Sequence, residues 1–462
     1  MFRAEGGGGS ANRGGMARTV PRGERWVVLA AGFVVMSVAG TCFSWSLYSR
    51  PLMAFFGWSS VQVALCFSCL VFFIGMGALA GGFLHDRYEP RKVALLGVLL
   101  WGAGGVLAGL GVERLGLLWL YLTYGAIAGI GCGISYVVPG ATVTKWFPEE
   151  RGLANGIILC GFGLGSLVFN IVVGAFPAFR RVADAAHLVI EQRSAAIVAG
   201  HAFSFPALET HQDVAVLAAV FLWSGVAFAV VGGIAALFLH LPPAGYTVPA
   251  AAAELALERD FTPAQMLRTR TFYVIWAIVF VNGICGLALL TNAVALYGNV
   301  AGLAGGAATI VFGYLSAANG VGRFVWAWLS DFIGRRGTIA ACLALQALAL
   351  LSLLVVRGPF AGGAAIAMAL LCFGGIYGVA PAVMAEFYGT KYFGENYAFV
   401  ITAGAAAGLV GPLGVALLEG ATGTLTGWIV PVSVAALLAA FLPLVATRPS
   451  QSTTGTLASQ ET

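Results

Sequence analysis

Charged residues are scarce in this sequence of 462 residues: Asp, Glu, Lys and Arg make up 9% of it, and hydrophobic residues make up 60%. An ordinary soluble domain has about 25% charged and about 45–50% apolar residues. The composition therefore excludes a soluble globular protein. It also excludes a membrane β-barrel, because the apolar runs do not alternate with polar residues as barrel strands do.

Residues that carry common enzyme chemistry are missing as well. The three lysines follow Arg91, Thr144 and Thr390, so the sequence has no Gly-Lys pair and no Walker A loop. The five histidines form no H-E-x-x-H pattern, and the eight cysteines all lie in apolar runs, where we expect them to pack as small side chains. The apolar runs contain no carboxylate for a Ser/His/Asp set. We therefore predict no enzyme activity, no cofactor and no metal site.

Long apolar runs are what the sequence has in abundance. A helix needs roughly 20 residues to cross the ~30 Å hydrocarbon core of a bilayer. Twelve runs of about that length cover residues 26–48, 61–84, 93–112, 115–140, 152–177, 214–240, 271–297, 304–330, 337–356, 358–385, 397–418 and 424–447. We therefore predict an all-α membrane protein with twelve transmembrane helices.

Cations are unevenly divided among the segments that join these runs. If the N-terminus is inside, the inner segments hold 17 of the 24 Lys and Arg residues and the outer segments hold six, while Arg323 lies within a run. The positive-inside rule then places both termini in the cytoplasm. The net charge of +5 thus reflects membrane topology, and we predict no nucleic-acid partner.

Two longer connections suggest how the chain is divided. We expect residues 178–213 to form an external loop and residues 241–270, which contain Pro242-Pro243, to form a cytoplasmic linker. The linker would separate an N-terminal six-helix bundle, residues 26–240, from a C-terminal six-helix bundle, residues 271–447. The polar segments 1–25 and 448–462 are expected to be flexible cytoplasmic tails.

The two halves share a repeated loop. One copy contains Asp86 after the second run, and the other contains Asp331 after the eighth, 245 residues later. Such repetition indicates a duplicated unit and hence two pseudo-symmetric bundles. An aspartate followed by cations at a helix end can bind the termini of neighbouring helices. We therefore predict a latch that opens during a conformational cycle, made of Asp86, Arg87, Arg91, Asp331, Arg335 and Arg336.

These loops resemble the G-x-L-a-D-R-x-G-R-K/R signature of the major facilitator superfamily, and the resemblance covers nearly the whole chain. It implies two six-helix bundles, a central binding site and alternating access by rocking. Other stretches are similar to the oxalate/formate antiporter family and its monocarboxylate-transporter relatives: Trp45-Ser-Leu-Tyr-Ser-Arg50-Pro-Leu, Lys145-Trp-Phe-Pro148, Thr262-Pro263 and Phe387-Tyr-Gly-Thr-Lys391. We expect a multi-pass protein of the cell membrane that works as a monomer in the lipid bilayer.

Arg323 is the one charged residue well inside an apolar run, eight residues or roughly 12 Å before Asp331. An arginine at that depth costs from about 2.5 to over 10 kcal/mol and keeps its charge. The matching position in the first half is Ala78, so the duplicated scaffold does not need a cation there. We therefore predict that Arg323 binds a substrate carboxylate, which a guanidinium can hold with two hydrogen bonds. A structural arginine bound to backbone carbonyls is the alternative.

Other candidate site residues follow from spacing and from the internal repeat. Helical spacing places on one stripe, which we expect to face a central cavity, Ser316, Asn319, Arg323 and Trp326. Aromatic residues of other runs could close the site: Trp45, Tyr48, Tyr136 and Tyr377. The last two are favoured because they occupy matching positions in both halves, at depths where a hydroxyl needs a partner. Weaker candidates for polar contacts are Asn282 and Asn292.

Charge limits the substrate. One fixed cation neutralises one carboxylate, so lactate, pyruvate or formate fits better than a dianion. In the oxalate-exchanging branch of the family, a lysine is expected in the eleventh span, but residues 397–418 contain no Lys or Arg. Arg50, at the outer end of the first run, is expected to draw anions toward the site.

The residue four positions before Arg323 bears on mechanism. Proton-linked monocarboxylate carriers of the family usually have an Asp there, and this sequence has Asn319. Without a carboxylate nearby, the empty site keeps an unpaired cation that reorients slowly. We therefore predict anion exchange over simple proton symport. Three alternatives stay open: a proton-coupled monocarboxylate symporter, a facilitator or exporter of a neutral solute or drug with a structural Arg323, and a sensor that does not transport.

Overall fold

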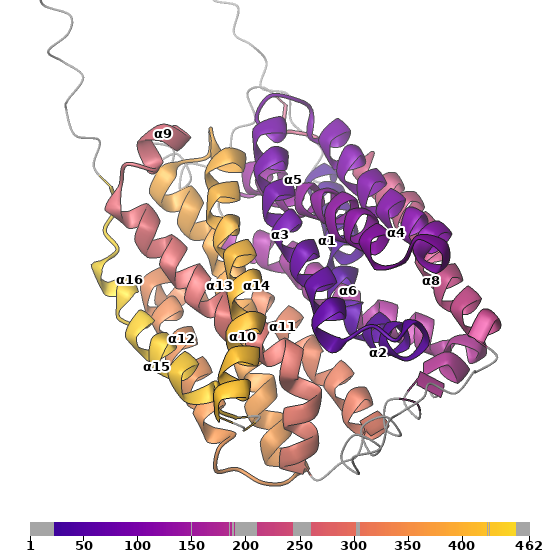
Figure 1. Ribbon diagram of the computed structural model, residues 1–462. Helices are drawn as coiled ribbons and strands as arrows, with labels where there is room; N and C mark the ends of the chain where they lie inside the picture. The colour runs from indigo at the N-terminus through magenta and orange to yellow at the C-terminus, as the bar shows by residue number, and fades with distance from the viewer. Residues whose placement is uncertain are drawn as a thin grey trace, which may run out of the picture.

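The computed structural model describes residues 23–148, 150–183, 185, 186, 189, 210–243, 260–301, 305–422, 424 and 426–449. Within these ranges, all regular structure is helical (Figure 1). Both predicted tails and the predicted external loop and linker lie largely outside the described residues.

The N-terminal half contains α1 (Glu24–Gly40), the 3-10 turn η1 (Thr41–Ser44), α2 (Trp45–Phe56), α3 (Ser60–His85), α4 (Pro90–Leu120), the π-helical stretch η2 (Tyr121–Ala128), α5 (Gly129–Trp146), α6 (Arg151–Ala175) and α8 (Thr210–Ala236). The C-terminal half contains α9 (Pro263–Met266), α10 (Arg270–Ala301), α11 (Gly305–Ile333), α12 (Arg335–Ser352), α13 (Pro359–Tyr388), α14 (Phe393–Thr422), α15 (Ile429–Ala439) and α16 (Leu442–Val445).

Local sequence signals explain several helix ends. Ser59 accepts a hydrogen bond from the backbone N–H of Gln62 at the start of α3, and the Gln62 side chain accepts one from Ser59 N–H, which makes a capping box. The chain reverses direction at Gly116, whose φ of 67° favours glycine. This reversal lies at the start of the predicted run 115–140, one residue inside it, and the helix from Pro90 to Trp146 is a hairpin of two arms.

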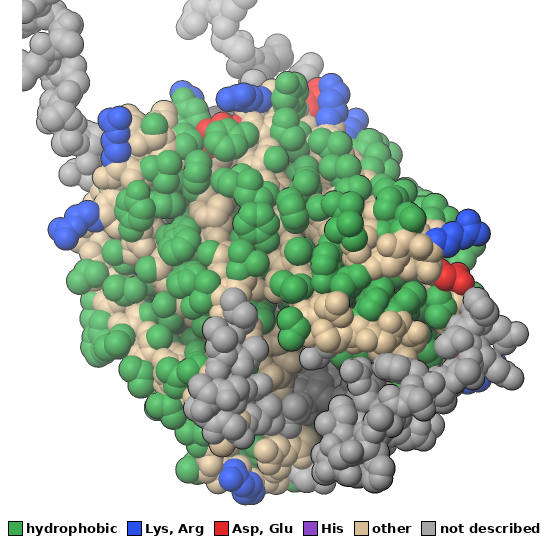
Figure 2. Space-filling view, in the orientation of Figure 1, with side chains coloured by type: hydrophobic (Ala, Val, Ile, Leu, Met, Phe, Trp, Pro, Cys, Tyr) green, Lys and Arg blue, Asp and Glu red, His purple; other side chains and the backbone are tan. Residues whose placement is uncertain are grey.

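The described part of the chain contains 7 helices that are long and apolar enough to cross a membrane, counting Pro90–Trp146 as one. Hydrophobic side chains cover most of the face shown in Figure 2, while Lys and Arg gather toward its rims. This surface fits a lipid environment and confirms a helical membrane protein. The number of spans and the side on which the termini lie stay predictions.

The two halves lie side by side, with α1–α8 in indigo to magenta and α10–α16 in salmon to yellow (Figure 1). Their most extensive contacts are two crossings, α3 with α14 and α6 with α11. Glycines bring the backbones together there: a Cβ added at Gly75 would lie 2.3 Å from the Cβ of Ala405, and one at Gly163 would lie 2.1 Å from the Cα of Gly320. Both crossings begin at the end of the molecule that carries Asp86 and Asp331, which we call the latch end.

Candidate substrate-binding site

Arg323 lies in the middle of α11 and is 2% exposed. Gly378 of α13 packs against its backbone, since an added Cβ there would be 2.2 Å from the Arg323 carbonyl oxygen. Within the part of the chain that the structure describes, the guanidinium makes one hydrogen bond, from Nη1 to the Tyr136 hydroxyl at 3.3 Å. Its Nε is buried and has no hydrogen-bond partner there. The cation is therefore held in place without being neutralised by a carboxylate of these residues.

Two aromatic rings stabilise this charge. The Cζ atom of Arg323 lies 4.9 Å from the centre of the Phe162 ring and 5.3 Å from the centre of the Tyr377 ring. Such cation–π contacts offset part of the desolvation cost of a buried guanidinium but leave its charge in place. The two rings come from α6 and α13, so both halves of the molecule contact the cation.

A pair of tyrosine hydroxyls extends the site across the two halves. The Tyr136 hydroxyl of α5 lies 3.4 Å from the Tyr397 hydroxyl of α14, and the two rings stack with centroids 6.4 Å apart. Tyr397 is 1% exposed. Sequence reasoning assigned Tyr397 no role in the site, although Asn396-Tyr397 is among the stretches similar to the antiporter family. Tyr397 is neutral and its role depends on packing, so the charge pattern of the sequence gives no signal for it.

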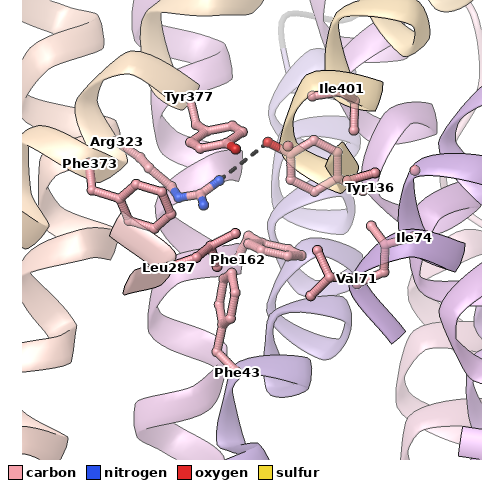
Figure 3. A pocket seen from close by; sticks show the side chains of 13 residues that line it. Phe43, Val71, Ile74, Tyr136, Phe162, Leu287, Arg323, Phe373, Tyr377 and Ile401 are labelled. Carbon is pink, nitrogen blue, oxygen red and sulfur yellow. Dashed lines mark hydrogen bonds between the residues drawn. The ribbon is translucent and has the colours of Figure 1, made fainter. Parts of the chain in front are cut away.

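A cavity of about 60 Å³, measured as the space open to the centre of a water-sized sphere, lies beside Arg323 (Figure 3). It has room for a few water molecules or for a ligand of that size. Both halves line it, through Phe43, Val71, Ile74, Gly75, Tyr136, Phe162, Leu287, Arg323, Phe373, Tyr377, Ile401, Gly404 and Ala405. Three of these residues have polar side chains, and Arg323 alone among them is charged. The site therefore suits a small ligand with one negative group and an apolar body.

The other residues of the predicted stripe do not line this cavity. Asn319 and Trp326 pack against α13, where glycines leave room for them: a Cβ added at Gly374 would lie 2.7 Å from Asn319 Oδ1, and one at Gly375 would lie 2.4 Å from the Trp326 ring. The expectation that the whole stripe faces the cavity is thus corrected to Arg323 alone among its described side chains. The side chain of Ser316 lies outside the described residues.

Trp45 and Tyr48 do not line the cavity either. Trp45 stacks on Tyr124 with ring centroids 5.3 Å apart, and Tyr48 stacks on Phe221 at 4.1 Å. All four rings belong to the N-terminal half, and the turn η1 separates α1 from α2, which carries Trp45 and Tyr48. The structure therefore does not bring these two aromatics to the cavity.

The remaining candidates have local roles or no described side chain. Asn282 donates a hydrogen bond to the Phe373 carbonyl at 3.1 Å, and Asn292 donates one to the Ala288 carbonyl at 3.1 Å. Both side chains therefore form hydrogen bonds with the backbone. Asn282 bonds to α13, and Asn292 bonds to its own helix. The side chain of Arg50 lies outside the described residues.

The two latch aspartates contact helix starts in the opposite half. Asp86 Oδ2 accepts a hydrogen bond of 3.0 Å from the backbone N–H of Glu395, in the first turn of α14. Asp331 forms an ion pair with Arg335, and its carboxylate lies against Gly152 in the first turn of α6, where it leaves no room for a Cβ. The positive end of a helix dipole favours a carboxylate at such a place. Arg87, Arg91 and Arg336 are exposed at the surface.

A family model described as Major Facilitator Superfamily matches residues 28–412. The chain belongs to the major facilitator superfamily. Among superfamily members, the oxalate:formate antiporter of Oxalobacter formigenes is 29% identical over 392 residues, 84% of each chain. Apicoplast pyruvate carrier 1 of Toxoplasma gondii is 28% identical over 370 residues, 71% of this chain and 64% of its own.

A solved structure of FucP, a superfamily transporter in the outward conformation, has a TM-score of 0.64 at 14% identity and covers 91% of this chain and 98% of its own. At this identity the likeness concerns the fold alone. Together the matches confirm the predicted superfamily and the predicted relation to oxalate/formate antiporters and carriers of monocarboxylates. The chain is a membrane transporter of this superfamily, and no comparison tests the individual site residues.

Proposed function

We propose that this transporter carries small monocarboxylate anions, of the lactate, pyruvate or formate type, by alternating access of the two halves. One observation carries the proposal: a buried guanidinium without a carboxylate partner among the described residues lies beside a small cavity between the halves. Relatives whose names specify oxalate, formate or pyruvate support the same chemical class.

The charge of the cavity favours a monoanion. Arg323 can neutralise one carboxylate, and the described lining residues include no second cation. A dianion such as oxalate would keep one uncompensated charge in an apolar surrounding, which is costly. α14 contributes Ile401, Gly404 and Ala405 to the lining, all without charge. We therefore infer that the substrate differs in charge from the oxalate named for the Oxalobacter relative.

The surroundings of the guanidinium limit how a carboxylate can approach. Aromatic rings lie within cation–π distance, and Nη1 bonds to Tyr136, so the edge that carries the unpartnered Nε is the part left for a ligand. A carboxylate bound at this edge through Nε and Nη2 would make two charge-assisted hydrogen bonds. Phe43, Leu287 and Phe373 would then contact the apolar part of the substrate.

Exchange is the expected mode of transport. An empty carrier must reorient with a buried, unpaired cation, whereas the loaded carrier holds a neutral pair. If the unpaired charge raises the free-energy barrier of the empty carrier by more than about 1.4 kcal/mol, reorientation of the empty carrier slows more than tenfold. We therefore expect efflux or uptake of labelled pyruvate in proteoliposomes to rise at least about tenfold when unlabelled pyruvate is present on the opposite side.

The same assay separates the alternatives. Equal rates with and without substrate on the far side would reject exchange, and acceleration by an inward proton gradient alone would favour proton symport. A panel of formate, lactate, pyruvate, oxalate and a neutral sugar tests the substrate class. Uptake of the neutral solute without uptake of any monocarboxylate would favour the facilitator alternative with a structural Arg323.

Membrane topology completes the proposal. We infer twelve transmembrane helices in two six-helix bundles, residues 26–240 and 271–447, joined by the linker 241–270, with both termini in the cytoplasm of a cell-membrane monomer. The excess of cations in the inner segments supports this orientation. The latch end is then cytoplasmic, and its packed crossings mean that the described conformation is closed on that side. Arg50 at the outer end of the first span would attract anions.

A further inference from the structure

The latch end contains a buried histidine that the transport mechanism does not use. His85 is the last residue of α3 and directly precedes Asp86. Its side chain is fully buried, and that of Asp86 is 6% exposed. A histidine titrates near neutral pH, and a buried one needs partners for both ring nitrogens.

Both ring nitrogens of His85 do have partners. Nδ1 lies 3.0 Å from Asp86 Oδ1, and Nε2 lies 3.3 Å from the Thr142 hydroxyl of α5. The Thr142 hydroxyl itself donates to the Val138 carbonyl at 2.8 Å. With that donation made, Thr142 can only accept from Nε2, and a carboxylate can only accept from Nδ1. The arrangement therefore accommodates a doubly protonated imidazole next to an ionised Asp86.

The same network also accommodates the loss of that proton. The Thr142 hydroxyl can rotate and donate to Nε2, while the Val138 carbonyl keeps its place in the helix of α5. His85 then stays hydrogen-bonded to Asp86 through Nδ1–H as a neutral side chain. A proton can thus be bound or released here without leaving a buried polar atom unsatisfied.

We propose that His85 and Asp86 form a proton-binding site that controls how firmly the latch holds α14. Without the proton, the pair carries the charge of Asp86, which faces the positive end of α14 through the Glu395 N–H. With the proton, the pair has no net charge and its attraction for that helix end falls. Protonation therefore favours opening of the latch end.

Other charged groups also contribute to the electrostatic surroundings of the His85–Asp86 pair. Lys145 of α5 lies 4.0 Å from Asp86 Oδ1, Glu395 belongs to α14, and Arg87 follows Asp86 in the loop. The repeated loop of the second half supplies an internal comparison. There the residue before Asp331 is Ser330, whose hydroxyl donates to the Ala327 carbonyl and does not titrate near neutral pH.

Hydrogen–deuterium exchange of the full-length protein in lipid nanodiscs tests this proposal without any substrate. After correction for the intrinsic exchange rate at each pH, the segment 393–400 of the wild type is expected to exchange about two- to fivefold faster at pH 5 than at pH 8, the range of a charge contact at a helix end. In His85→Gln, whose amide is always neutral, this difference disappears. Segment 152–158, which faces Asp331, shows no such difference in either protein.

His240→Gln serves as the matched control, because His240 pairs with Glu24 at 3.0 Å and makes no contact with Asp86. It should keep the pH dependence of the wild type. Equal protection of segment 393–400 at both pH values in the wild type would overturn the proposal, and so would a pH dependence that persists in His85→Gln. Equal wild-type protection at the two pH values overturns the proposal even if His85→Gln does not fold. Because no anion is present, the outcome is independent of the proposed transport function.

Discussion

Arg323→Ala is expected to abolish carboxylate exchange, with a loss of more than about 100-fold. The substitution removes the one charge among the residues that line the cavity. Losing one partner of a buried, hydrogen-bonded charge pair costs about 2–5 kcal/mol, and each 1.4 kcal/mol is about tenfold. Labelled pyruvate exchange by purified protein in proteoliposomes measures the effect.

Thermal stability separates substrate binding from a structural role in the same variant. The guanidinium lacks a carboxylate partner in the described part of the chain, so its removal should leave the melting temperature unchanged or raise it. Arg114→Ala, at an exposed position, is the matched control and should transport normally. A fall in melting temperature together with lost insertion would indicate a structural arginine, and normal exchange by Arg323→Ala would exclude the proposed binding role.

Gly163→Leu is expected to stop exchange by preventing the described conformation. A Cβ at Gly163 would lie 2.1 Å from the Cα of Gly320 and 2.5 Å from its N atom, and backbone atoms cannot move aside cheaply. The crossing of α6 and α11 must then separate, which opens the latch end and blocks return to the closed form. We expect an exchange rate at least about 100-fold lower, since displacing one conformer by 3 kcal/mol depletes it by about that factor.

A second glycine of the same helix provides the control for this change. Gly174 of α6 has no atom within 4 Å of an added Cβ, so Gly174→Leu should exchange at nearly the wild-type rate. Distances between spin labels on the exposed residues Tyr88 and Lys391 should increase in Gly163→Leu. Normal exchange or an unchanged distance distribution in Gly163→Leu would show that the α6–α11 contact is not part of the transport cycle.

Much of the helical framework could be predicted from the sequence, because long apolar runs leave a chain in lipid few other conformations. The reversal at Gly116 lies one residue inside the predicted run 115–140, close to its predicted start. The break of the first run at η1 (Thr41–Ser44) is not predicted by the sequence, because the turn depends on packing.

The candidate site could be predicted only in part. Arg323 was found from its charge, because a lone cation in an apolar run is costly and needs a reason. Helical spacing alone could not show that Gly374 and Gly375 draw α13 over Asn319 and Trp326. Phe162 and Tyr397 are neutral aromatic residues, so their contacts with the Arg323–Tyr136 pair appear only in three dimensions.

Equilibrium binding of labelled formate, lactate and pyruvate to the purified protein tests the central claim most directly. The account predicts saturable binding of at least one of them to the wild type and a several-fold loss of affinity in Tyr136→Phe, which removes one hydrogen bond of about 1 kcal/mol. It predicts no measurable binding in a folded Arg323→Gln. Undiminished binding of the same anion by Arg323→Gln would contradict it.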